Sequence, residues 1–86
     1  MEITVEIVCT VFSEDYEPQI QAFIKNLRQS PFKVEETALT TLVFGDFEQV
    51  LPFVNQLMYK FFKQNSESLV SMRIIPGDRS GYKPNF

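Results

Sequence analysis

The chain has 86 residues, of which 44% are hydrophobic and 22% charged, and its net charge is −3. This size and composition predict one globular domain and exclude a multidomain or disordered chain. The weak acidity predicts no binding to nucleic acid or to an anionic membrane surface.

The residue types that are missing exclude several kinds of site. There is no histidine, which excludes His-based triads, histidine general bases and histidine metal sites. Cys9 is the single cysteine, so neither an intramolecular disulfide nor a thiolate metal cluster can form. We therefore expect no catalytic residue, no metal and no cofactor, and Cys9 is interpreted as a small core residue. We also expect no signal peptide, no membrane span and a cytoplasmic location.

Two strand–helix units and two further strands are predicted in chain order. Residues 1–12 alternate with period 2, which is typical of a strand, and residues 16–27 have helical spacing, with Asp15 or Glu17 as the expected cap. Residues 32–37 and 39–44 predict two short strands. Asp46 is the expected cap of a second helix over residues 47–62, and Pro52 predicts a kink or a loosened first turn there. Residues 69–75 predict the last strand.

This βαββαβ order predicts an α+β fold of the ferredoxin-like class, a split βαβ sandwich. The expected sheet is antiparallel with four strands in the order 4-1-3-2, and both helices cover one of its faces. Residues 1–76 form the expected domain and residues 77–86 an irregular tail. The side chains expected on the helix side are Ile3, Val5, Ile7, Cys9, Val11, Val34, Leu42, Phe44, Val70, Met72 and Ile74. The side chains expected on the open face are Thr4, Glu6, Val8, Thr10, Leu39, Thr41, Val43, Leu69, Ser71 and Arg73.

The chain lacks the functional residues of three well-known classes of protein with this fold. RNA-recognition domains stack bases on open-face aromatics, where this chain has Thr, Glu, Val and Leu. Metal chaperones need a second cysteine near Cys9, and acylphosphatase-like enzymes need an arginine within residues 12–17. The sequence therefore predicts a protein that is not an enzyme.

Glu6 is the most informative candidate, because it is a carboxylate in the middle of a central strand. It is interpreted either as the cross-strand partner of Arg73 or as a group that meets a ligand or a partner chain. The apolar residues expected beside it on the open face predict a homodimer or homotetramer assembled through that face.

Two segments of the chain carry short motifs. The first, SPFKVEETALTTLVFGDFEQV, contains Ser30, Thr41, Gly45 and Asp46, and the second, SLVSMRIIPGDR, ends in an Asp-Arg pair. Both segments resemble the small thiamine-binding, or YkoF-like, family, which has motif residues at these four places and a similar last strand and Asp-Arg tail. Val8 and Thr40 depart from the pattern, standing where Ser and Gly are frequent. The resemblance implies a ferredoxin-like, oligomeric protein that binds thiamine or its hydroxymethylpyrimidine part.

The expected ligand is therefore a small heteroaromatic molecule near the open face or a subunit boundary. Thr10, Thr41 and Ser71 offer hydroxyl groups that can donate to or accept from an aminopyrimidine. Glu6 or Tyr16 can face a cationic thiazolium. The alternative is a regulatory or interaction module, like the amino-acid-sensing (ACT-like) domains of this topology, with no affinity for thiamine.

Overall fold

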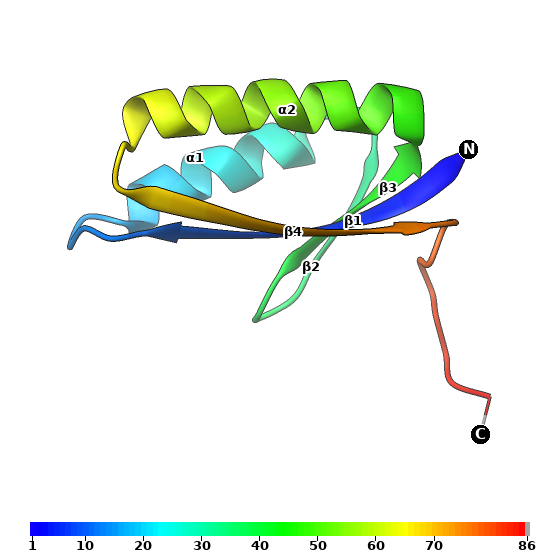
Figure 1. Cartoon of the computed structure of the whole chain (residues 1–86). Coiled ribbons are helices and arrows are strands. Elements are labelled where there is room, and N and C mark those ends of the chain that lie inside the picture. The colour runs from blue at the N-terminus through cyan, green and yellow to red at the C-terminus, as the bar shows by residue number, and fades with distance from the viewer. Residues whose placement is uncertain (86) are drawn as a thin grey trace.

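The computed structural model describes residues 1–85 and shows two helices packed on one face of a four-stranded antiparallel sheet (Figure 1). The elements are β1 (Glu2–Val11), α1 (Glu17–Arg28), β2 (Lys33–Glu36), β3 (Thr41–Asp46), α2 (Phe47–Gln64) and β4 (Ser68–Pro76). The sheet order is β2-β3-β1-β4, which is the predicted order taken from the other edge. The α+β class and the sheet order are thus confirmed. Phe86, the last residue of the predicted tail, lies outside the described residues.

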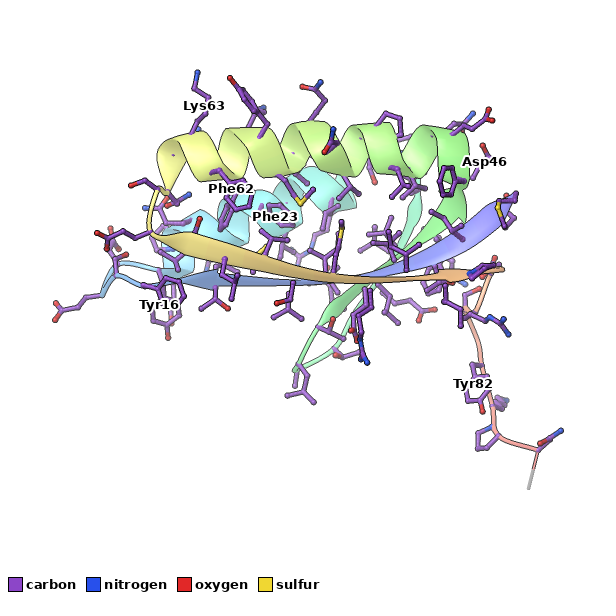
Figure 2. The ribbon with its side chains drawn as sticks, viewed as in Figure 1. Tyr16, Phe23, Asp46, Phe62, Lys63 and Tyr82 are labelled. Atoms are coloured by element: carbon purple, nitrogen blue, oxygen red, sulfur yellow. The ribbon has the colours of Figure 1, made fainter. Side chains whose placement is uncertain are left out.

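The core lies between the helices and the sheet and comes from alternate residues of the strands. Ile3, Val5 and Ile7 of β1 are at most 2% exposed and contact buried residues of both helices. Phe23 of α1 and Phe61 of α2 meet edge to face, with ring centroids 5.3 Å apart, and Figure 2 shows Phe23 in the layer between the helices and the sheet. Cys9 packs against the same core, as predicted.

The helix boundaries follow local chemistry, with two corrections. Asp46 caps α2 by accepting a hydrogen bond from the Glu48 amide, as predicted. Tyr16 is the N-cap of α1 without a side-chain hydrogen bond, so the expectation of Asp15 or Glu17 in this place was wrong. α2 runs unbroken through Pro52. Pro52 is exposed, so the carbonyl that loses its amide partner can bond to water instead.

The strand pairing corrects the predicted faces of β3. Val43 lies opposite Val5, and Thr41 lies opposite Ile7. Because directly opposed residues share a face of the sheet, Thr41 and Val43 point toward the helices and not into the open face. The side chains of the neighbouring Leu42 and Phe44 lie on the open face, although they were predicted on the helix side. The prediction that Leu39 belongs to the open face was also wrong, because Leu39 lies in the turn between β2 and β3 and is 87% exposed.

The segment after β4 is tied to one end of the open face. The Gly77 carbonyl accepts from the Thr4 hydroxyl, and that hydroxyl oxygen accepts from the Arg79 amide. Thr4 is therefore only 5% exposed although it belongs to the open face. Phe44, opposite Thr4 on β3, is 3% exposed, with the Lys33 ammonium 5.8 Å from its ring centre. Residues 77–85 form no helix or strand, and Figure 1 shows them leaving the sheet on the side away from the helices.

Candidate functional site

The open face has a shallow depression centred on an ion pair between its two longest strands. Glu6 of β1 lies opposite Arg73 of β4, and Arg73 Nε donates to Glu6 Oε1 at 2.6 Å. The predicted cross-strand pair is thus confirmed. The depression has a volume of about 320 Å³ and is lined by Thr4, Glu6, Leu42, Arg73, Ile74 and Ile75. This volume is near the lower end of small-molecule pockets, so one ring system is the largest ligand it accommodates well.

The ion pair leaves hydrogen-bonding capacity free on both partners. Arg73 contacts one oxygen of Glu6, and within residues 1–85 the second oxygen, Oε2, accepts no hydrogen bond. The Glu6 side chain is 26% exposed and the Arg73 side chain 84% exposed, so both are accessible. The depression therefore presents a carboxylate acceptor and planar guanidinium donors side by side, between the apolar side chains of Leu42 and Ile75.

The hydrogen bond from Arg73 lowers the pKa of Glu6 below its ordinary value of 4.5. A carboxyl whose pKa is lower in the folded than in the unfolded protein stabilises the fold above its unfolded pKa. That stabilisation is lost as the pH falls through the folded pKa. We therefore expect the free energy of unfolding to decrease below about pH 4.5 partly through Glu6.

Replacing Glu6 with Gln should reduce this acid dependence, because the amide does not titrate. Denaturation by urea at pH 7 and at pH 3 measures the difference. Arg73→Gln is expected to reduce the acid dependence by the same amount, and the double variant by no more than either single one. Additive effects of the two changes would show that the hydrogen bond from Arg73 is not what lowers the pKa of Glu6, and would contradict this prediction.

The five residues singled out from the sequence do not form one cluster. Glu6 lies in the depression, and Ser71 follows it on the open face, opposite Val8. Thr10 is opposite Leu69, four residues and about 13 Å beyond Glu6 along β1. Tyr16 lies past the end of β1 and is 46% exposed, and Figure 2 shows it at that end of the molecule. Thr41 is 8% exposed on the helix side, so the sheet separates it from Glu6, Thr10 and Ser71.

Sequence reasoning missed Leu42 and Ile75, the two apolar walls of the depression. Leu42 was assigned to the other face because Leu42, Val43 and Phe44 are all apolar, so alternation cannot set the phase of β3. Ile75 lies opposite Thr4, at the end of β4. The signal that could have identified it is its position two residues after Arg73, since alternate residues of a strand share a face.

Neither a metal site nor a reactive cysteine is found in the described part of the chain. Residues 1–85 contain no group of three or more His, Cys, Asp or Glu that could hold a metal ion. Burial raises the pKa of the Cys9 thiol to about 12, so this cysteine is protonated at neutral pH and is a poor nucleophile. Separately, none of the helices within residues 1–85 has the length and apolar character needed to cross a membrane.

Comparison with known proteins supports the fold. No family model matches the chain, and no curated protein matches it significantly in sequence. Among solved structures, protein SP2199 of Streptococcus pneumoniae superposes with a TM-score of 0.82 at 14% identity, covering 95% of this chain and 93% of that one. A "putative thiamine biosynthesis/salvage protein" of Thermotoga maritima superposes with a TM-score of 0.80 at 22% identity, covering 90% and 85%.

A third structure, a domain of unknown function (DUF77) from Bacillus cereus, has a TM-score of 0.73 at 17% identity and covers 96% of this chain and 83% of that one. These identities are all below 25%, so the likeness shows the fold alone. The chain therefore has the fold of a group of small α+β proteins that includes the thiamine-related protein and the DUF77 domain.

Proposed function

We propose that this chain is a small oligomeric binding protein of the ferredoxin-like class, related to the YkoF-like family, that takes thiamine or its hydroxymethylpyrimidine part on its open sheet face. The observation that carries the proposal is the Glu6–Arg73 pair, which places an acceptor and donors at the centre of the depression. The thiamine class of ligand is supported by the Thermotoga maritima protein of this fold, which is named for thiamine biosynthesis or salvage.

The geometry favours the pyrimidine half of thiamine over the thiazolium half. A 4-aminopyrimidine carries an exocyclic amine that can donate to Glu6 Oε2 and ring nitrogens that can accept from Arg73. The guanidinium plane can also stack on an aromatic ring. A cationic thiazolium next to Arg73 would instead be repelled by the like charge of the guanidinium. The carboxylate of Glu6 would offset this little, because its charge is already neutralised by Arg73. In this proposal the thiazolium, when present, extends along β1 toward Ser71 and Thr10.

The proposal that the protein is not an enzyme rests on its residue types. The chain has no histidine, and its single cysteine is held protonated by burial. The binding role therefore depends on hydrogen bonds and on shape, in the cytoplasmic compartment that the lack of a disulfide framework favours.

Assembly through the open face belongs to the same proposal. Val8, Leu42, Leu69 and Ile75 contribute apolar surface there, and Leu69 and Ile75 are 50% and 45% exposed. Contact with a second copy would cover these side chains and close the depression, which is open to solvent in one chain. A closed site removes water from the Glu6–Arg73 pair and strengthens its hydrogen bonds to a ligand.

Calorimetric titration with hydroxymethylpyrimidine and with thiamine tests the ligand. Both should bind the unaltered protein, and Glu6→Gln should weaken binding at least tenfold, because the amide turns an acceptor toward the ligand into a mixed donor and acceptor. Glu36→Gln is the matched control, because Glu36 forms a similar ion pair with Arg28 but lies away from the depression. Glu36 is opposite Thr41 in the sheet and therefore on the helix side. This control should bind like the unaltered protein.

Three outcomes would contradict this assignment. No heat and no thermal stabilisation with millimolar thiamine or hydroxymethylpyrimidine would remove the ligand class. Equal loss of affinity in Glu6→Gln and Glu36→Gln would show that the effect is general and not local to the depression. Stabilisation by an amino acid and not by either thiamine compound would favour the sensing module in place of the thiamine site.

A further inference from the structure

Within residues 1–85, the depression at Glu6 has no aromatic side chain in its lining. The residues that line it are Thr4, Glu6, Leu42, Arg73, Ile74 and Ile75. A flat ring bound there keeps one face in water, because the depression is shallow and open to solvent. Rings of the nucleobase type bind more tightly when an aromatic side chain stacks on that exposed face. A pyrimidine ligand would therefore gain affinity from an aromatic side chain that reached it from elsewhere in the chain.

The segment that follows β4 is anchored at one end of this depression. Its anchor is Thr4, whose hydroxyl donates to the Gly77 carbonyl at 2.9 Å and accepts from the Arg79 amide at 2.9 Å. The Gly77 amide in turn donates to the Glu2 carbonyl at 2.7 Å. Gly77 has a φ of +95°, which turns the chain out of the strand at a value that other residues rarely adopt. The chain is thus fixed to the open face as far as Arg79.

Beyond this anchor, a turn through a glycine leads to an exposed tyrosine. The Tyr82 amide donates to the Arg79 carbonyl at 3.3 Å, which closes the turn. Gly81, inside the turn, has a φ of +69°, and a Cβ atom built on it would meet no atom within 4 Å apart from its chain neighbours. The backbone conformation therefore requires this glycine, and packing does not. Tyr82 is 73% exposed, and Figure 2 shows it on the side of the sheet away from the helices.

The length of this segment allows Tyr82 to reach the depression. The three residues from Arg79 to Tyr82 span up to about 10 Å. Glu6 lies two residues beyond Thr4 on β1, which is about 7 Å. Leu42 is diagonal to Thr4 across the β1–β3 pair, which places it about 7–8 Å away. The centre of the depression is thus within reach of Tyr82 while the Arg79 amide stays bonded to Thr4.

Arg73 offers the tyrosine ring a partner in the depression even when no ligand is bound. Its side chain is 84% exposed, and the hydrogen bond from its Nε to Glu6 Oε1 holds the guanidinium group in place. A planar guanidinium group stacks on aromatic rings and attracts them through a cation–π interaction. Movement of Tyr82 over the depression therefore gains a contact at Arg73, and a ligand ring bound there would gain a second stacking face.

We propose that residues 80–85 form a strap that closes over the depression and stacks the ring of Tyr82 on a heteroaromatic ligand bound there. This inference rests on the proposed function and adds to it a residue that selects for ligands with a flat ring. The strap covers the depression from the Thr4 end. Val8 and Leu69 lie toward the other end of the open face, so the strap and a second copy would close the depression from two sides.

Disulfide trapping tests the closure without any ligand. In a Cys9→Ala background, Leu42→Cys and Tyr82→Cys together should form a disulfide within one chain under mild oxidation. Closure brings their Cα atoms within the range of a disulfide, about 4.4–6.8 Å. Leu69→Cys with Tyr82→Cys is the matched control. Leu69 lies on the same face but about 20 Å along β4 from Ile75, beyond the reach of the strap, and this pair should stay reduced.

Calorimetric titration with hydroxymethylpyrimidine tests the contact with the ligand. Tyr82→Ala should weaken binding at least about fivefold, the lower end of what stacking of a base on an aromatic side chain contributes. Tyr82→Phe keeps the ring and should bind like the unaltered protein. Tyr59→Ala is the matched control, because Tyr59 is also an exposed tyrosine, at 62%, but lies on α2 on the other side of the sheet. It should leave the affinity unchanged.

The strap and the proposed function fail in different ways. An unaltered protein that binds neither hydroxymethylpyrimidine nor thiamine would contradict the proposed function, and the trapping experiment then decides on the strap alone. The strap is overturned if the folded Leu42→Cys/Tyr82→Cys variant stays reduced or cross-links only between chains. It is also overturned if the Leu69→Cys/Tyr82→Cys control oxidises as readily, or if Tyr82→Ala binds hydroxymethylpyrimidine as tightly as the unaltered protein does.

Discussion

Replacing Val43 with lysine is expected to unfold the protein at 25 °C. Val43 is fully buried between Val5 and Val34 on the helix side of the sheet. A lysine there would bury an ammonium group without a carboxylate partner, and small domains have only about 5–15 kcal/mol of stability to lose. Far-ultraviolet circular dichroism and a urea titration measure the result.

The neighbouring variant Leu42→Lys is the matched control for this experiment. Leu42 is one residue away on the same strand but lies on the open face, opposite Glu6 and Glu35. Its lysine can reach water and a carboxylate, so we expect a folded protein with weaker association through the open face. A folded Val43→Lys variant, or an unfolded Leu42→Lys variant, would show that the faces of β3 are assigned the wrong way round.

Replacing Gly45 with alanine is expected to cost about 1–3 kcal/mol of stability, the usual penalty of overpacking a core. A Cβ atom at Gly45 would lie 2.7 Å from Val50 Cγ2 and 3.0 Å from the Phe32 ring. Val50 is fully buried in the first turns of α2 and cannot move aside without disturbing the helix. Chemical denaturation of the variant measures the cost.

A double-mutant cycle with Val50→Ala shows whether this contact is the cause. Removing the Val50 methyl groups makes room for the new Cβ, so Gly45→Ala should cost less in the Val50→Ala background than in the unaltered protein. Equal costs in the two backgrounds would place the effect elsewhere, at the contact between the new Cβ atom and the Phe32 ring.

Much of the fold could be predicted because it follows from local patterns. The alternation of residues 1–12, the helical spacing before Leu27 and the capping residue Asp46 each depend on neighbours within a few positions. With the preference for right-handed crossovers, the element order then leads to the observed sheet order. The position of Glu6 opposite Arg73 followed from the same alternation and is confirmed.

The candidate site was predicted less well because it depends on how strands pair. Glu6 and Arg73 were placed on the correct face, but the walls of their depression, Leu42 and Ile75, were not recognised. Thr41 was assigned to the same face as Glu6, although it packs against the helix side. A shift of one residue in a strand moves every side chain to the other face, so one error in β3 changed the predicted membership of the site.

The sequence by itself determined the class of the protein: a small α+β domain with no histidine and a single cysteine. The proposed binding role draws on one carboxylate and a few hydroxyl groups among its residues. Tertiary structure alone decided the faces of β3, because Leu42, Val43 and Phe44 are all apolar and the phase is set by pairing Val43 with Val5. It also decided that Phe44 is buried on the open side, since Thr4 and Lys33 flank it on adjacent strands. Such contacts join residues tens of positions apart, and no local pattern encodes them.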